Sequence, residues 1–139
     1  MMKMRILAVL FLVIAAAGAD APDPAKIKEK VTIEVGKKKL VQFEQKGDDL
    51  KNPKVVEKAD DKLMIPSFDF SKSDGNLILT TKNPFPKNLK FRALARLKGR
   101  KDYFETSIVP VQSGLLSFEL WQDPIEELIL FDFKLTDEK

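Results

Sequence analysis

Residues 89–101 read LKFRALARLKGRK, and this segment decides how the rest of the chain is interpreted. Every second residue from Leu89 to Leu97 is apolar, and most residues between them are basic. Complete alternation over five apolar positions is typical of a β-strand with one buried face. A helix is the competing interpretation, because ALARLK has high helix propensity and Phe91, Leu94 and Leu97 lie three apart. We favour the strand.

The residues that follow support this choice because they complete a hairpin. A two-residue type II′ turn at 99–100 would set the register, since glycine suits its first position. The pairs expected from this register are Leu97 with Asp102, Arg96 with Tyr103, Ala95 with Phe104, Ala93 with Thr106, and Phe91 with Ile108. The register places the apolar members on one face, and a slip of one residue would scatter them over both faces.

Alternating segments separated by turn residues continue on both sides of this hairpin. The other expected strands cover 31–35, 40–44, 63–70, 77–81, 116–121 and 128–135. We expect the first two to form a hairpin. We interpret 46–61 as a loop; the alternatives are a short helix that begins at Asn52-Pro53 and a stub of strand at Val55-Val56. The side chains expected to share a face are Met64, Phe68 and Phe70 in one strand, Leu116, Phe118 and Leu120 in another, and Ile129, Phe131, Phe133 and Leu135 in the last. About eight short strands predict an all-β fold, an antiparallel β-sandwich of immunoglobulin-like or jelly-roll type.

The N-terminus has the three-part layout of a secretory signal peptide. Lys3 and Arg5 precede an apolar run from residue 6 to 17, and small residues follow. We expect cleavage after Ala19; the alternatives are cleavage after Ala21 and a retained membrane anchor, for which the apolar run is short. The expected organisation is a signal peptide at 1–19, a flexible leader at 20–30 and one domain at 31–139. We expect a periplasmic or secreted protein with no transmembrane segment in the mature chain.

The charge of the expected mature chain is close to balanced. Of 24 basic and 21 acidic residues, the signal segment holds two basic and no acidic ones. The basic sequence therefore does not indicate nucleic-acid binding. The distribution is uneven, however, because residues 87–101 contain seven cations and no acid, whereas residues 119–139 contain seven acids.

The composition also limits the chemistry that is available. The chain has no His and no Cys, so the commonest general base, thiol catalysis and thiolate metal sites are absent. Two carboxylate pairs, 60–61 and 126–127, are sequence neighbours that would point to opposite faces of a strand. Oxygen ligands at Asp69, Ser71, Asp74 and Asn76 are better explained as a hairpin tip than as a calcium site. We expect no enzymatic activity, no cofactor and no metal site.

The cationic run is the strongest lead to a binding surface. Its outward side chains would be Lys90, Arg92, Arg96 and Lys98, with Arg100 and Lys101 at the turn. We expect them to bind an acidic protein or an anionic polymer or lipid of the cell envelope. The alternative is a solvated face that keeps sheets from pairing edge to edge, with Glu105 and Tyr103 neutralising part of the charge.

Two aromatic residues are further candidates for binding. Phe85 lies between two prolines, where it is either an exposed anchor for a partner or a plug of the core. Trp121 falls on the side of its strand away from Phe118, so it is either a surface platform or a residue covered by the turn at Pro124.

These observations together predict a non-catalytic exported binding or accessory module of the cell envelope. Two alternatives stay open. One is a carrier that holds an apolar ligand between two sheets. The other is a proteinaceous hydrolase inhibitor that inserts the rigid loop 83–88 into the cleft of its target.

Overall fold

The computed structural model describes residues 21–60 and 62–138. The predicted signal peptide and its cleavage site lie outside the described residues. A short 3-10 helix, η1 (Pro24–Lys26), is followed by nine strands. The strands are β1 (Lys30–Glu34), β2 (Lys37–Lys46), β3 (Asp49–Val56), β4 (Ser67–Ser73), β5 (Asn76–Lys82), β6 (Asn88–Leu97), β7 (Tyr103–Thr106), β8 (Leu116–Trp121) and β9 (Ile125–Thr136). Within the described residues no helix is long and apolar enough to cross a membrane.

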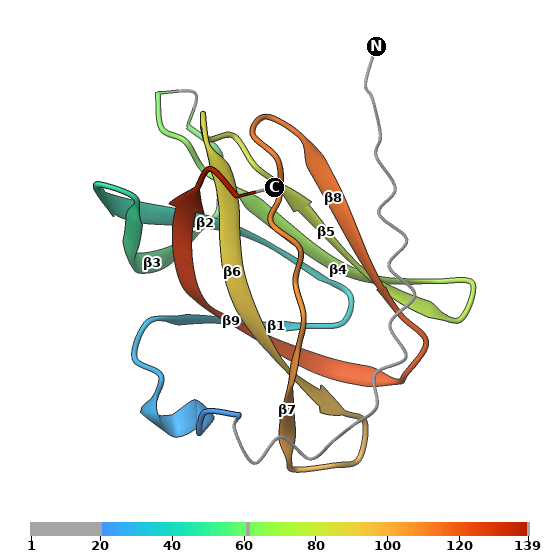
Figure 1. The fold of residues 1–139 in the computed structure, drawn as a ribbon. Helices are drawn as coiled ribbons and strands as arrows, with labels where there is room; N and C mark the ends of the chain where they lie inside the picture. The colour runs from blue at the N-terminus through green and yellow to red at the C-terminus, as the bar shows by residue number, and fades with distance from the viewer. Residues whose placement is uncertain (1–20, 61, 139) are drawn as a thin grey trace.

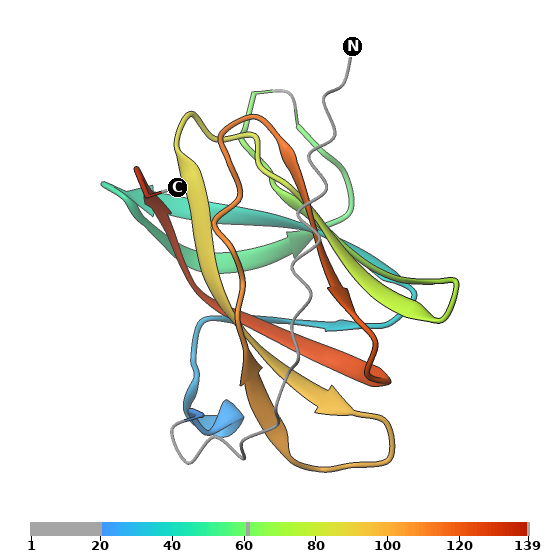
Figure 2. The same ribbon diagram turned by 45° about the vertical axis from the view of Figure 1, so that its right-hand side comes forward.

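All nine described strands belong to one antiparallel sheet (Figure 1). The strand order is β7-β6-β9-β3-β2-β4-β5-β8, and β1 pairs with β9 beside this path. The sheet curls, so that its concave face encloses the core (Figures 1 and 2). The predicted all-β antiparallel class is confirmed. The predicted division into two packed sheets of a sandwich is not confirmed, because strand pairing joins all nine described strands into one sheet.

The β6–β7 hairpin has the register that the sequence predicts. Arg96 pairs with Tyr103, Ala95 with Phe104, and Ala93 with Thr106. The predicted turn type is wrong, because the Arg100 N–H donates to the carbonyl of Leu97 and the turn is therefore centred on 98–99. Gly99 takes a φ of +78°, which a residue with a Cβ rarely adopts. Beyond β7 the register differs by one residue from the predicted register. Leu89 pairs with Val111, whereas continuing the predicted pairs would place residue 110 opposite Leu89.

The concave face is filled by aromatic rings around Phe68. Its fully buried ring meets Phe91 edge to face at 5.4 Å and Phe133 at 6.0 Å. Phe133 also packs on Phe43 at 4.7 Å, and Phe70 packs on Trp121 at 6.0 Å. These rings come from strands far apart in the sequence, so they hold the curled sheet together.

A second, smaller apolar cluster lies on the convex side of β6 and β9. Leu94, Ile129 and Phe131 form it, and Ala21 and Ile27 pack against it from the segment where we expected a flexible leader. The prediction that Ile129 and Phe131 share a face with Phe133 is wrong. β9 contains a bulge between the partners of Lys90 and Arg92, and its Asp132 has a φ of +55°. One extra residue in a strand reverses which side chains face the core.

Three further predictions about strands are wrong. β1 pairs with β9 and not with β2, so the expected first hairpin does not form. The expected loop 46–61 contains β3, which pairs along β2. Met64 is 51% exposed, because β4 begins only at Ser67 and the residues before it form an irregular connection.

Candidate functional site

The cationic run divides into two parts in the structure. The stem comprises Lys87, Lys90, Arg92 and Arg96, at and along β6, and each of these side chains forms an ion pair. The tip comprises Lys98, Arg100 and Lys101, in the connection between β6 and β7. The two parts differ in how much positive charge they leave free.

Arg92 is the most fully partnered cation of the stem. Its guanidinium donates two hydrogen bonds to the carboxylate of Glu105, at 2.7 and 2.8 Å, in the fork-to-fork geometry of strong charge-assisted pairs. It also lies over the ring of Phe131 at 4.8 Å. The hydrogen bonds that Arg92 donates to Glu105 are the largest cause that raises the pKa of Arg92. The predicted neutralisation by Glu105 is confirmed for this residue.

The acidic C-terminal segment neutralises two more stem residues. Lys90 pairs with Glu138 at 2.8 Å, which lowers the pKa of that carboxyl. Arg96 reaches both Glu126 and Glu127, at 3.3 and 3.5 Å. Neighbouring glutamates were expected to point to opposite faces, and this expectation is wrong because a register shift beside Arg96 makes Glu126 an extra residue in β9.

Arg96 also has the aromatic neighbour expected from the hairpin register. Its guanidinium lies 6.0 Å from the centroid of the Tyr103 ring. The Tyr103 hydroxyl donates to Glu127, so the ring, the guanidinium and the carboxylate form one group on the convex side. The stem therefore presents a set of satisfied pairs, and exposed pairs of this kind contribute little to stability.

The tip cations differ from the stem cations in exposure and in ion pairing. Lys98, Arg100 and Lys101 are exposed, and none of the ion pairs between described residues involves them. The acid nearest in sequence is the exposed Asp102. The main chain of the tip is fixed at its base, because the Lys98 N–H donates to the carbonyl of Pro124 at 2.8 Å. Of the predicted binding residues, these three retain charge that a partner can use.

Phe85 and Trp121 are both buried, at 3% exposed each. Phe85 plugs the core, and its loop is held by Asn83, whose side-chain oxygen accepts from the Phe85 N–H at 2.8 Å. Trp121 points inward and donates from its indole N–H to the hydroxyl of Thr106 at 2.9 Å. The interpretations as an exposed anchor and as a surface platform are therefore wrong.

The buried face of β8 is not the face that carries its leucines. Ser117, Glu119 and Trp121 are buried, whereas Leu116, Phe118 and Leu120 are only partly covered. Glu119 is 4% exposed, and one of its oxygens accepts from the Val109 N–H at 3.0 Å. The bond from Trp121 joins β8 to Thr106, the last residue of β7, and the bond to Glu119 comes from Val109, just beyond β7. β7 and β8 are the two ends of the strand order, so these bonds link the two edges of the sheet.

Glu119 is the residue of chemical interest that the sequence interpretation missed. Burial raises the pKa of its carboxyl to about 7, and the hydrogen bond from Val109 opposes part of that shift. Shifted carboxyls occur in active sites. This one is sealed in the core, with the aliphatic Leu79 as its cross-strand partner, so a substrate cannot reach it. The sequence signal for its burial was weak. Glu119 lies two residues before Trp121 and therefore on the same face of the strand.

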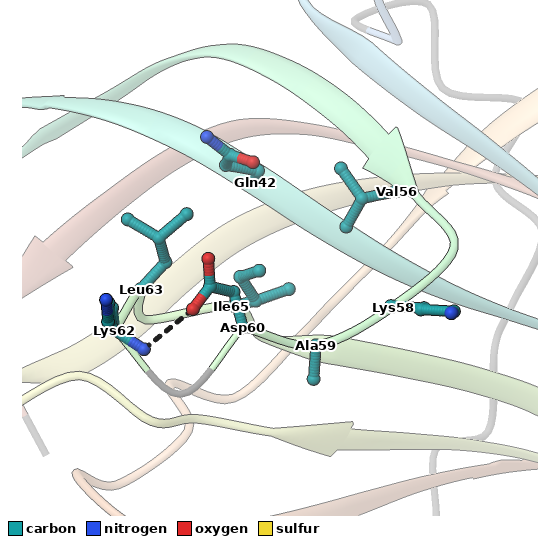
Figure 3. A pocket seen from close by; sticks show the side chains of 8 residues that line it. All are labelled: Gln42, Val56, Lys58, Ala59, Asp60, Lys62, Leu63 and Ile65. Carbon is teal, nitrogen blue, oxygen red and sulfur yellow. Dashed lines mark hydrogen bonds between the residues drawn. The ribbon is translucent and has the colours of Figure 1, made fainter.

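A wide hollow of about 590 Å³ lies beside the connection from β3 to β4 (Figure 3). Its lining is Gln42, Val56, Lys58, Ala59, Asp60, Lys62, Leu63 and Ile65. Figure 3 shows the Asp60 carboxylate turned back to accept from the Lys62 N–H. The hollow contains charges of both signs and shares no lining residue with the tip. We therefore take the tip as the candidate site.

Comparisons with protein families, with curated proteins and with solved structures found no match. Within the described residues no group of three or more acidic side chains is placed to hold a metal ion.

Proposed function

We propose that the protein is an exported, non-catalytic binding module that docks on an anionic surface of the cell envelope. Lys98, Arg100 and Lys101 make the contact. The observation that carries this proposal is the contrast between the stem, where each cation has an acidic partner, and the tip, where no cation forms an ion pair with a described residue. A charge that is already paired has little to gain from a second anion, whereas an unpaired one keeps its full attraction.

The exported location rests on the signal-peptide layout of the sequence, with the periplasm first and full secretion second. The absence of His and Cys supports a role without catalysis. An acidic protein is a second partner that the same three cations would attract.

The other two roles have less support. A carrier needs room inside the sheet, but the rings around Phe68 fill the middle of the core. A hydrolase inhibitor needs a presented loop, but Phe85 is buried and its carbonyl accepts from the Ser113 hydroxyl at 2.8 Å. We therefore propose neither.

Neutralising the tip tests the proposal. The variant Lys98→Gln, Arg100→Gln, Lys101→Gln should bind phosphatidylglycerol vesicles roughly a hundredfold more weakly than the wild type at low salt, at about 1 kcal/mol for each cation near an anionic surface. Co-sedimentation with the vesicles measures the loss.

A matched control carries the same change in net charge in the stem. The variant Lys87→Gln, Lys90→Gln, Arg92→Gln should lose less than about threefold, because these cations are already paired. Equal losses in the two variants would show that overall charge, and not the tip, governs binding.

A further inference from the structure

Four connections between strands gather at one end of the curled sheet, beside the tip. They are the β1–β2, β4–β5, β6–β7 and β8–β9 connections. The ribbon views show the β1–β2, β4–β5 and β8–β9 connections toward the right and the β6–β7 connection below them (Figures 1 and 2). Main-chain hydrogen bonds tie them together. The Val35 N–H donates to the carbonyl of Glu126 at 3.1 Å, the Gly36 N–H to Phe70 at 2.7 Å, and the Lys98 N–H to Pro124 at 2.8 Å. Main-chain hydrogen bonds therefore fix the connections at this end of the sheet relative to one another.

These connections surround a half-enclosed pocket of about 450 Å³. Its lining is Val35, Lys72, Gly75, Leu77, Lys98, Gln122, Asp123, Pro124, Ile125 and Glu126. Leu77 and Ile125 are buried members of the main core, so the core itself forms part of the pocket wall. The volume falls within the range of roughly 300–1,000 Å³ that is common for small-molecule sites.

The charges around this pocket favour an anion. Lys72 and Lys98 contribute from different hairpins, and neither forms an ion pair with a described residue. Of the two acids, Glu126 is already paired with Arg96, which leaves Asp123. The lining therefore carries two cations without an ion pair to a described residue against one such acid.

We propose that this pocket binds a single-chain anionic amphiphile, with its acyl chain against Val35, Leu77 and Ile125 and its carboxylate between Lys72 and Lys98. The inference rests on the proposed function, because Lys98 belongs both to the tip and to the pocket, and it specifies the anionic partner as a lipid-like molecule. Each additional buried CH₂ group should tighten binding about fourfold until the pocket is full.

Titration with fatty carboxylates tests the inference. We expect dodecanoate, below its micellar concentration, to bind more tightly than octanoate, and acetate not to bind. Amide shifts of the ¹⁵N-labelled protein locate the ligand. The fluorescence of Trp121 gives a second readout, since it is the single tryptophan of the chain and the cross-strand partner of Leu77. Dodecyltrimethylammonium, which has the same chain and the opposite charge, should bind at least tenfold more weakly.

Two variants and one control separate the contributions. Val35→Phe fills the pocket and should weaken dodecanoate binding at least tenfold. Lys72→Gln changes an exposed residue outside the tip, which leaves the fold intact, and should weaken it about threefold. Ile78→Phe enlarges a side chain on the opposite face of β5 from Leu77, and should have no effect.

The outcomes distinguish failure of the pocket from failure of the proposed function. Tip-dependent vesicle binding without chain-length-dependent binding of carboxylates would overturn the pocket and leave the proposed function standing. Dodecanoate binding that neither Val35→Phe nor Lys72→Gln weakens would also overturn the pocket. Equal affinity for the cationic amphiphile would overturn its anion preference. If the wild-type protein binds neither the vesicles nor dodecanoate, both proposals are refuted.

Discussion

At pH 8, Glu119→Gln should be more stable to unfolding than the wild type by about 3 kcal/mol, and at pH 4 the two proteins should be about equally stable. The reason is that burial raises the pKa of Glu119 from 4.5 to about 7. Between these values the folded protein holds a proton that the unfolded chain has released. The contribution of Glu119 to stability therefore falls as the pH rises through this interval, and levels off above it.

Urea unfolding of both proteins from pH 4 to pH 8.5 measures this effect. The other carboxyls titrate in both proteins, so the difference between the two stability curves isolates Glu119. The glutamine keeps an oxygen that can accept from the Val109 N–H, so the bond between the sheet ends can persist. Two curves that run parallel over the whole range would show that Glu119 is not buried as described.

Phe68→Ala should destabilise the protein by about 3–5 kcal/mol, the usual cost of removing a fully buried ring. Phe68 contacts Phe91 and Phe133, which come from β6 and β9, so the cavity would loosen the contact between distant strands. Chemical denaturation at one pH measures the loss.

Phe118→Ala is the matched control, because it removes the same atoms from the convex face of β8. Its cost should be about 1 kcal/mol, typical of partly exposed positions. A cost for Phe118→Ala that equals that of Phe68→Ala would mean that β8 turns its phenylalanine, and not Glu119 and Trp121, toward the core.

What could be predicted from the sequence was mostly local. The β6–β7 register follows from alternation and a glycine turn within twenty residues, and the pairing of Arg92 with Glu105 follows from that register. The pairing of β1 with β9 joins the two ends of the domain, and no pattern within either strand indicates it.

Single-residue irregularities account for most of the errors about side-chain direction. The extra residue near Asp132 moves Ile129 and Phe131 to the convex side, and the extra residue at Glu126 brings two glutamates to Arg96. Alternation assumes an unbroken strand, so it fails after each such residue.

The prediction of which face of β8 is buried failed for a different reason. Its two faces are both plausible cores, one with three large aliphatic or aromatic side chains and one with a tryptophan. The choice is made by contacts from elsewhere in the fold, since Trp121 finds Thr106 and Glu119 finds Val109. The binding surface could not be predicted for the same reason, since its charge balance depends on contacts between distant segments. The acidic partners of Lys90 and Arg96 come from the C-terminal part of the chain.

The measurement that tests the division of the cationic run most directly is residue-resolved binding by NMR. Anionic bicelles containing phosphatidylglycerol would be added to the ¹⁵N-labelled protein, and the amide signals of residues 87–101 would be followed. We expect the signals of 98–101 to shift or broaden first, while those of 90–94 stay unchanged. Changes centred on 90–94, with the tip unaffected, would contradict the account.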